Sequence, residues 1–310
     1  MKQILAACAF VFLGFLPGEE PKLFTNWLTI ENLGPVVNSI YIDSCVAISK
    51  DGLSLYFSST RLGSNPANNA LRDLFVSKRV SKDSDWQTPV PLTIINSPYW
   101  DSCPSLSLDE HRLYFTSNRP GWCGGQEIWA SRRQDRRDDS WQEPVNLGCQ
   151  QDGYVNSIYS ELTPTLFEDE SGKVWMYFSS YRTGTPASWD HYQSEMGDDD
   201  TFEPATPIIE LNSGYTDQGI TVRRDGLEVF FLSNRGGEHT SMDFWRATRA
   251  STEDPWSEIV SVPSLGNPAY AQGRIALSFD GRELYFTSSR PDGVDRELWV
   301  AKRERVRGPE

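Results

Sequence analysis

The chain has few of the residues on which catalytic and metal sites commonly depend. Histidine occurs only three times in 310 residues, and the five cysteines include no Cys-x-x-Cys spacing of the kind that binds zinc. A Gly-rich phosphate loop, a Gly-x-Ser-x-Gly turn and a His-Glu-x-x-His motif are also missing. Because His191 and His239 have no fixed local spacing, we interpret them as surface residues. We therefore predict no cofactor, no metal site and no catalytic nucleophile.

Positive charge is also scarce. The chain has 29 Lys and Arg against 43 Asp and Glu, which gives a net charge of -14. A surface of that sign repels phosphate backbones and anionic headgroups unless a local basic stripe offsets it. Basic clusters such as residues 132–137 are interleaved with aspartates. We therefore predict no nucleic-acid partner and no membrane-surface partner.

The first residues have the layout of a secretory signal. Lys2 precedes an apolar run from Ile4 to Leu16, and Pro17-Gly18 ends the run before two glutamates. This run is too short to span a membrane. We predict that residues 1–18 are a signal peptide and that residues 19–310 form a single domain. The mature protein is then expected to be periplasmic or secreted, monomeric and not inserted in a membrane.

One pattern of residues occurs five times along the chain. An asparagine followed three residues later by a tyrosine recurs at intervals of 55 to 60 residues, and an aromatic strand that ends in Ser-x-Arg follows each copy. The asparagines are Asn38, Asn96, Asn156, Asn212 and Asn267, and the arginines are Arg61, Arg119, Arg182, Arg235 and Arg290. Five coincidences at that spacing indicate a tandem repeat.

Each repeat predicts four antiparallel strands. Short turn sequences such as Asp51-Gly52 join the first two strands as a hairpin. A fourth strand begins with an aromatic residue in most copies, and the third opens with an acid, namely Asp73, Glu127, Asp190, Asp243 or Glu297. Because this acid and the arginine of Ser-x-Arg occur together in all five copies, we predict an ion pair between them within each repeat.

The two ends of the chain complement each other. The last repeat stops after its third strand, near Lys302, whereas a fourth-strand pattern without a repeat of its own lies at Trp27 to Val37. A ring explains both facts, because the N-terminal strand can complete the last unit and leave no open sheet edge. The sequence therefore predicts an all-β fold: a five-bladed β-propeller of four-stranded antiparallel blades, closed by the N-terminal strand in the last blade.

The repeat also resembles a known type. Leu-Tyr-Phe-Thr-Ser-Asn-Arg-Pro-Gly at residues 113–121 and Ser-Phe-Asp-Gly-Arg-Glu-Leu-Tyr-Phe-Thr-Ser-Ser-Arg at residues 278–290 are similar to the WD40-like propeller repeat of TolB-type proteins. The similarity covers residues 38–302, and we expect no counterpart of the separate N-terminal domain of TolB. This resemblance implies a propeller, and it is compatible with periplasmic binding, scaffolding or an enzyme.

We predict the functional site at the mouth of the central channel. The innermost strands place Asp43, Asp101, Glu161, Asp217 and Gln272 at one equivalent position, and two residues later stand Cys45, Cys103, Thr163, Gly219 and Arg274. Aromatic rings on or near the same face are Trp100, Trp122 and Trp189, which could stack on a ligand. A carboxylate repeated in four blades can equally be a structural residue that duplication has copied. Arg274 breaks the repeat and is the stronger candidate for a ligand contact.

Two functions from different classes fit this site. We predict a protein that binds a macromolecule, either a protein or a polysaccharide, through the channel mouth. The alternative is a carbohydrate-active hydrolase or lyase that uses two of the four carboxylates, with Arg274 as an anion clamp. Glycosidase carboxylates need a separation of about 5 to 9.5 Å across an open cleft. Carboxylates tied to arginines or to backbone amides would remove the basis of the enzyme hypothesis.

The cysteines predict disulfides. Four of them remain in the mature chain, enough for two bridges in an oxidising compartment. We predict that Cys123 bonds to Cys149, because the strand order of the second repeat brings both to the same face. Whether Cys45 bonds to Cys103 depends on the channel width, since a disulfide needs Cα atoms about 4.4 to 6.8 Å apart.

Overall fold

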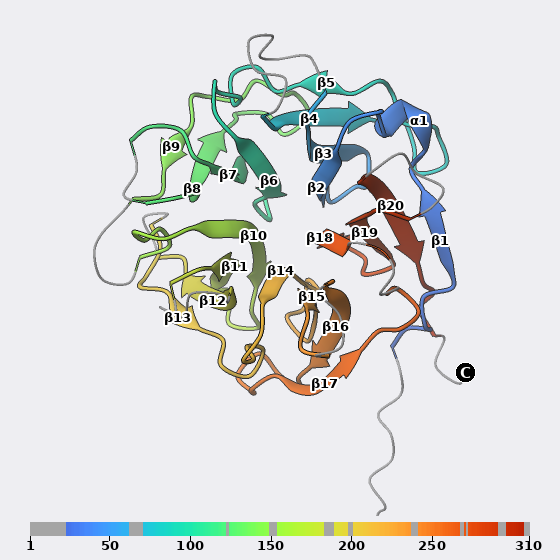
Figure 1. Ribbon diagram of the computed structural model, residues 1–310, viewed down its shortest axis with the longest axis vertical. Helices are drawn as coiled ribbons and strands as arrows, with labels where there is room; N and C mark the ends of the chain where they lie inside the picture. The colour runs from blue at the N-terminus through green and yellow to red at the C-terminus, as the bar shows by residue number, and fades with distance from the viewer. Residues whose placement is uncertain are drawn as a thin grey trace, which may run out of the picture.

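The fold was determined as a computed structural model, which describes residues 23–61, 71–121, 124–148, 154–182, 189–197, 201–236, 241–266, 270, 272–290 and 296–306. Within these ranges the strands form five sheets of four antiparallel strands each, arranged around a central axis (Figure 1). The predicted five-bladed propeller is confirmed.

The blades follow one another in chain order, and within each blade the first strand lies nearest the axis (Figure 1). Blade 1 consists of β2 (Asp43–Ile48), β3 (Ser54–Ser59), β4 (Asp73–Lys78) and β5 (Val90–Pro91). Blade 2 consists of β6 (Asp101–Leu106), β7 (Arg112–Ser117), β8 (Glu127–Arg132) and β9 (Val145–Asn146). Blade 3 consists of β10 (Glu161–Glu168), β11 (Val174–Ser180), β12 (Asp190–Glu195) and β13 (Thr206–Pro207). Blade 4 consists of β14 (Asp217–Val222), β15 (Glu228–Ser233), β16 (Asp243–Thr248) and β17 (Ser257–Ser261). Blade 5 consists of β18 (Gln272–Leu277), β19 (Glu283–Ser288), β20 (Glu297–Lys302) and β1 (Thr29–Asn32).

The hydrophobic core lies between neighbouring blades. Each of five clusters of buried side chains combines residues from two adjacent sheets. Between blades 1 and 2, Tyr56 meets Trp141 edge-on with ring centroids 6.4 Å apart, and between blades 4 and 5, Phe244 meets Phe286 at 5.2 Å. Because a blade is covered on both faces, its second strand is buried along nearly its whole length, and large aromatic rings fill the wedge between two sheets.

Wherever the structure describes it, the asparagine of the repeat connects a blade to the one before it. Asn96 accepts a hydrogen bond from the backbone N–H of Leu74 (2.7 Å) and donates one to the carbonyl of the same residue (2.9 Å). Asn156 bonds Ile128 in the same way. The side-chain amide thus extends the short fourth strand by one more pair of hydrogen bonds along the third strand, which explains why an asparagine recurs at this point.

The N-terminal strand closes the ring. Strand β1 pairs antiparallel with β20, with Thr29 opposite Lys302 and Asn32 opposite Trp299 (Figure 1). The predicted closure is confirmed, but the predicted strand is too long: Gly34–Val37 forms the short helix α1. Pro35 lies in its first turn, where the missing N–H costs no helical hydrogen bond. No helix in the described ranges is long and apolar enough to cross a membrane.

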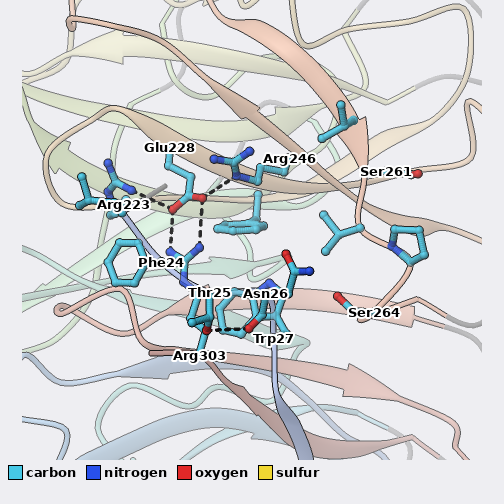
Figure 2. A pocket seen from close by; sticks show the side chains of 15 residues that line it. Phe24, Thr25, Asn26, Trp27, Arg223, Glu228, Arg246, Ser261, Ser264 and Arg303 are labelled. Atoms are coloured by element: carbon cyan, nitrogen blue, oxygen red, sulfur yellow. Dashed lines mark hydrogen bonds and ion pairs between the residues drawn. The ribbon is translucent and has the colours of Figure 1, made fainter. Parts of the chain in front are cut away.

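The segment before β1 lines a groove of about 450 Å³ between blades 4 and 5 (Figure 2). Buried Glu228 accepts hydrogen bonds there from Arg303 (2.6 and 3.0 Å), Arg246 (2.6 Å) and Arg223 (3.0 Å). Burial alone would raise the pKa of Glu228, but the arginines outweigh it and lower the pKa to about 2. Arg303 also lies over the ring of Trp27 at 4.7 Å. These groups bind one another, so the groove is a joint of the closed ring.

Candidate functional site at the channel mouth

The four predicted carboxylates begin the innermost strands and have no exposed surface. Each contacts the arginine of its own Ser-x-Arg motif: Arg61 and Asp43 at 2.6 Å, Arg119 and Asp101 at 2.7 Å, Arg182 and Glu161 at 3.1 Å, Arg235 and Asp217 at 2.7 Å. A serine satisfies the second oxygen; Ser39, for example, donates its N–H (2.6 Å) and its hydroxyl (2.8 Å) to Asp43. Because each of the four acids is held by an arginine and a serine, none of them is free to act as a nucleophile or general base.

The partner of the Ser-x-Arg arginine differs from the prediction. The sequence predicts the acid of the third strand, whereas the arginine pairs with the acid of the innermost strand. Ser59, at the end of β3, lies opposite Asp43 on one side and Asp73 on the other, so both acids border the same strand end. Sequence spacing cannot separate two such neighbours. Among the third-strand acids, Glu127 accepts a hydrogen bond from Asn146 of the fourth strand at 2.6 Å.

Blade 5 departs from this arrangement. Gln272 replaces the carboxylate and is 9% exposed, and neither amide atom has a hydrogen-bond partner among the described residues. The hydroxyl of Ser288 and Nε of Arg290 also have no hydrogen-bond partner among the described residues. In blades 1 to 4, the equivalent Nε donates a hydrogen bond to the equivalent serine hydroxyl. The serine that contacts the acid elsewhere is Pro268 here, outside the described residues. Blade 5 therefore lacks both the carboxylate and its serine donor.

The residues two positions after the four acids and Gln272, which were also predicted for the site, line a narrow channel. Cys45, Cys103, Thr163, Gly219 and Arg274 all have positive φ angles, between 39° and 59°, at a bulge of the innermost strand. All of them except Gly219 border a cavity of about 40 Å³. The channel is narrow enough for a Cys45–Cys103 disulfide between blades 1 and 2, with Cα atoms 4.5 Å apart. Cys123 and Cys149 lie outside the described residues, so that bond stays a prediction.

Arg274 is one of three arginines close together at the mouth. The others, Arg72 and Arg296, directly precede the third strands of blades 1 and 5. Burial lowers the pKa of Arg274 to about 10, and repulsion from Arg72 and Arg296 adds to the effect. Burial and repulsion from Arg296 likewise lower the pKa of Arg72 to about 10. Arg72 and Arg274 therefore remain cationic at neutral pH. Of the three arginines, sequence reasoning found only Arg274.

The predicted tryptophans are only partly accessible. Trp100 is half-buried, with the guanidinium of Arg72 4.8 Å from its ring centroid. Trp189 is also half-buried and packs against Tyr181 with centroids 5.3 Å apart. Trp122 lies outside the described residues. Trp100 and Trp189 thus border the channel-mouth face but are partly covered by neighbouring side chains.

Among the described residues, the most exposed aromatic rings of this face are the tyrosines of the repeat itself. Tyr41, Tyr99, Tyr159 and Tyr215 are 36 to 48% exposed, and each stands two residues before an innermost strand. Their backbone N–H groups bond the serine of the motif, but this contact does not require an aromatic side chain. The signal was present in the fivefold Asn-x-x-Tyr pattern, which sequence analysis used only as a marker of the repeat.

The location of His191 differs from the prediction. The sequence predicts a surface residue, whereas the ring is fully buried against Phe231 with centroids 5.4 Å apart. Burial lowers the pKa of His191 to about 4, so the ring is neutral at physiological pH. His239 lies outside the described residues, and the described part of the chain has no group of three or more potential metal ligands.

No protein-family model matches the chain, and no curated protein matches its sequence. Solved structures match the fold. An α-L-arabinofuranosidase from Lactobacillus brevis aligns with a TM-score of 0.57 at 14% identity, over 86% of this chain and 91% of that one. The α-L-arabinofuranosidase of Podospora anserina, solved with cellotriose, aligns at 0.57 and 12% identity, over 90% and 97%. A thermostable family-43 glycoside hydrolase aligns at 0.56 and 14% identity, over 88% and 92%.

A putative TolB from Agrobacterium tumefaciens aligns less well, with a TM-score of 0.48 at 15% identity over 86% of this chain and 78% of that one. A similarity at this level supports no assignment, so the TolB type stays a prediction. The better matches have 12 to 14% identity. They show that this chain shares its propeller fold with glycoside hydrolases.

Proposed function

We propose that this protein is an exported propeller that binds a polysaccharide through its channel-mouth face. The observation that carries the proposal is the ring of exposed tyrosines at the entrances of the innermost strands. Exposed aromatic rings that the fold does not need are typical of binding surfaces, because they combine a large apolar face with a polar hydroxyl. The names of the structural neighbours, which include arabinofuranosidases and a cellotriose complex, favour a carbohydrate over a protein as the ligand.

Export is part of the proposal. The Cys45–Cys103 disulfide supports it, because structural disulfides persist mainly in oxidising compartments. The signal layout of residues 1–18 points the same way. We therefore propose residues 19–310 as a monomeric mature protein in the periplasm or outside the cell.

A carbohydrate-active hydrolase is the second candidate. The fold shared with glycoside hydrolases favours it. The geometry of the four predicted carboxylates opposes it, because arginines and serines hold all of them in buried pairs. A hydrolase built on this scaffold would need carboxylates other than these four.

Binding to soluble arabinan, xylan, cello-oligosaccharides and oligogalacturonate, measured by calorimetry on the mature protein, tests the proposal. Replacing Tyr99 or Tyr159 by Ala should weaken the bound glycan about 3- to 10-fold, the loss expected for one aromatic contact of about 0.5 to 1.5 kcal/mol. Val80→Ala is the matched control, since Val80 is an exposed apolar residue at the other end of blade 1.

Three results would count against the proposal. Binding to none of the glycans would contradict it, as would tyrosine variants that bind like the wild type. Release of reducing sugars from any of these substrates by the wild-type protein would show a hydrolase and replace the binding proposal by the second candidate.

A further inference from the structure

Three arginines meet at the channel mouth where blades 5, 1 and 2 join. The carbonyl of Arg296 accepts a hydrogen bond from the N–H of Asp43, and the carbonyl of Arg72 accepts one from the N–H of Asp101, both at 2.9 Å. Arg296 and Arg72 therefore occupy equivalent positions at successive joints between blades. Arg274 comes from the innermost strand of blade 5, beside the first of these joints. The three cations thus belong to two adjacent blades.

None of the three arginines forms an ion pair with a carboxylate among the described residues. Arg274 donates one hydrogen bond, from Nη1 to Oε1 of Gln218 at 3.1 Å. Arg72 lies over the ring of Trp100, and its Nε is buried without a partner in the described part of the chain. The arginines of blades 1 to 4 that follow Ser-x each contact a buried acid instead. Within the described part of the chain, the mouth arginines thus have no carboxylate partner.

The scaffold does not require cations at these positions. Position 274 needs a left-handed backbone, which glycine adopts most easily, and the other blades place Cys, Thr or Gly there. At the position of Arg72 and Arg296, the other blades have Gln126, Trp189 and Met242. Burial of Arg72 and Arg274, together with repulsion between guanidinium groups, disfavours the charged forms of these two side chains and lowers their pKa values, so both cost stability. Side chains that cost stability without serving the fold are typical of functional sites.

Other groups without partners surround the arginines. Nε1 of Trp100 is buried beneath Arg72 and has no acceptor among the described residues. Gln272, two residues before Arg274, is nine-tenths buried with an amide group that is equally unpaired. An indole N–H and guanidinium groups can only donate hydrogen bonds. A cluster of such donors needs an acceptor, and a carboxylate supplies two oxygens in the geometry that guanidinium prefers.

Exposed tyrosines precede the two strand starts that are hydrogen-bonded to Arg296 and Arg72. Tyr41 and Tyr99 stand two residues before Asp43 and Asp101, the residues whose N–H groups bond Arg296 and Arg72. If the carboxylate of a ligand binds the arginines, a ring that carries this carboxylate could therefore pack against the tyrosine side chains. A sugar acid presents such a ring and carboxylate together, whereas an aspartate or glutamate side chain presents no ring.

We propose that Arg72, Arg274 and Arg296 form a binding site for the carboxylate of an acidic sugar, so that the ligand of the channel mouth is a uronate-containing polysaccharide. This inference rests on the proposed function and narrows it. Because the protein carries a net charge of -14, long-range attraction does not bring an acidic polymer to it. Recognition depends on the local contacts of the three arginines.

The test compares oligogalacturonate with a neutral arabino-oligosaccharide of similar length, using calorimetry on the mature protein. We expect oligogalacturonate to bind more tightly. Arg72→Gln, Arg274→Gln and Arg296→Gln should each weaken it about 10- to 100-fold, the loss expected for a charged hydrogen bond, and should leave binding of the neutral glycan unchanged. Arg137→Gln is the matched control, because that arginine is 85% exposed in the turn between β8 and β9 and pairs with Asp135.

Melting temperatures provide a second measurement. Because Arg274 is repelled by Arg72 and Arg296, Arg274→Gln should melt at or above the wild-type temperature. Replacement of a purely structural arginine would instead lower the melting temperature. A variant that melts lower and binds oligogalacturonate like the wild type overturns the proposal.

The remaining outcomes separate this inference from the function on which it rests. If the neutral glycan binds as tightly as oligogalacturonate, the carboxylate site is wrong while polysaccharide binding stands. If neither glycan binds, both proposals fail. If poly-L-glutamate binds as tightly as oligogalacturonate and Tyr99→Ala changes neither, the arginines recognise an acidic peptide and the sugar-acid assignment is overturned.

Discussion

Nη2 of Arg235 lies 2.7 Å from Oδ1 of Asp217, which is fully buried, while the guanidinium side chain is 13% exposed. The same arginine reaches the carbonyl of Leu211 and the hydroxyl of Ser233. One side chain thus connects the start of the innermost strand, the end of the second strand and the loop from the preceding blade. Repeated in four blades, this contact fixes the channel-mouth loops.

We expect Arg235→Ala to lower the free energy of unfolding by about 3 to 5 kcal/mol, because it leaves the buried carboxylate of Asp217 without its charge partner. Urea unfolding measures the loss. Arg290→Ala is the matched control within the same fold. Gln272 replaces the acid in blade 5, so Arg290→Ala leaves no buried carboxylate without a charge partner. It should therefore lower the free energy of unfolding by less than Arg235→Ala does. Equal losses in the two variants would show that the ion pair itself contributes little.

The closure of the ring depends on Trp27. Its side chain is buried against Phe230, with ring centroids 5.6 Å apart, and lies beneath Arg303. Trp27→Ala should therefore lower the free energy of unfolding by about 3 to 5 kcal/mol. The neighbouring Leu28 is 59% exposed, and Leu28→Ala should change stability by no more than about 0.5 kcal/mol. Comparable effects of the two substitutions in thermal or urea unfolding would argue against docking of this segment in blade 5.

The Cys45–Cys103 disulfide joins residues 58 positions apart in the sequence. Closing a loop of that length restricts the unfolded chain and stabilises the fold by about 4 kcal/mol in the chain-entropy treatment. The double variant Cys45→Ser/Cys103→Ser should lose most of this free energy in urea unfolding under oxidising conditions. A reductant should lower the stability of the wild type by breaking this disulfide. The double variant has no such bond, so it should not show this loss. An unchanged midpoint in the double variant would refute the contribution.

His191 predicts a dependence of stability on pH. Its pKa in the folded protein is about 4, below the value of 6.5 expected when it is exposed, because burial disfavours the charged ring. Protonation therefore favours the unfolded state. The contribution of the neutral ring is fully present above pH 6.5 and is lost as the pH falls towards 4.

The loss amounts to about 3 kcal/mol from the difference of the two pKa values. His191→Phe removes this titration, so the stability of the wild type relative to the variant should fall between pH 6.5 and pH 4. Unfolding by urea at a series of pH values measures the difference. Parallel pH profiles of the two proteins would contradict the buried, neutral state of the ring.

Local and periodic features of the fold could be read from the residues. Asn-x-x-Tyr, Ser-x-Arg and the acid of the third strand mark the blades because they recur in all five copies, although in blade 5 the arginine finds no carboxylate at the innermost strand. Asn96 bonds the third strand of the preceding blade, and Arg61 secures the start of an innermost strand. The missing last strand and the surplus first strand were sufficient to predict closure, because a sheet edge in a ring must find a partner.

The sequence by itself determined the number of blades, their strand order and the position of the channel mouth. Tandem duplication makes these features visible, because each copy of the repeat has the same residues at nearly the same spacing. Only the tertiary structure decided which of two acids the repeated arginine binds, since both lie beside the same strand end. It also decided that His191 is buried and that Arg72 and Arg296 lie near Arg274. These relationships join residues of different strands and blades, and the distance between two such residues is set by how the sheets pack around the axis.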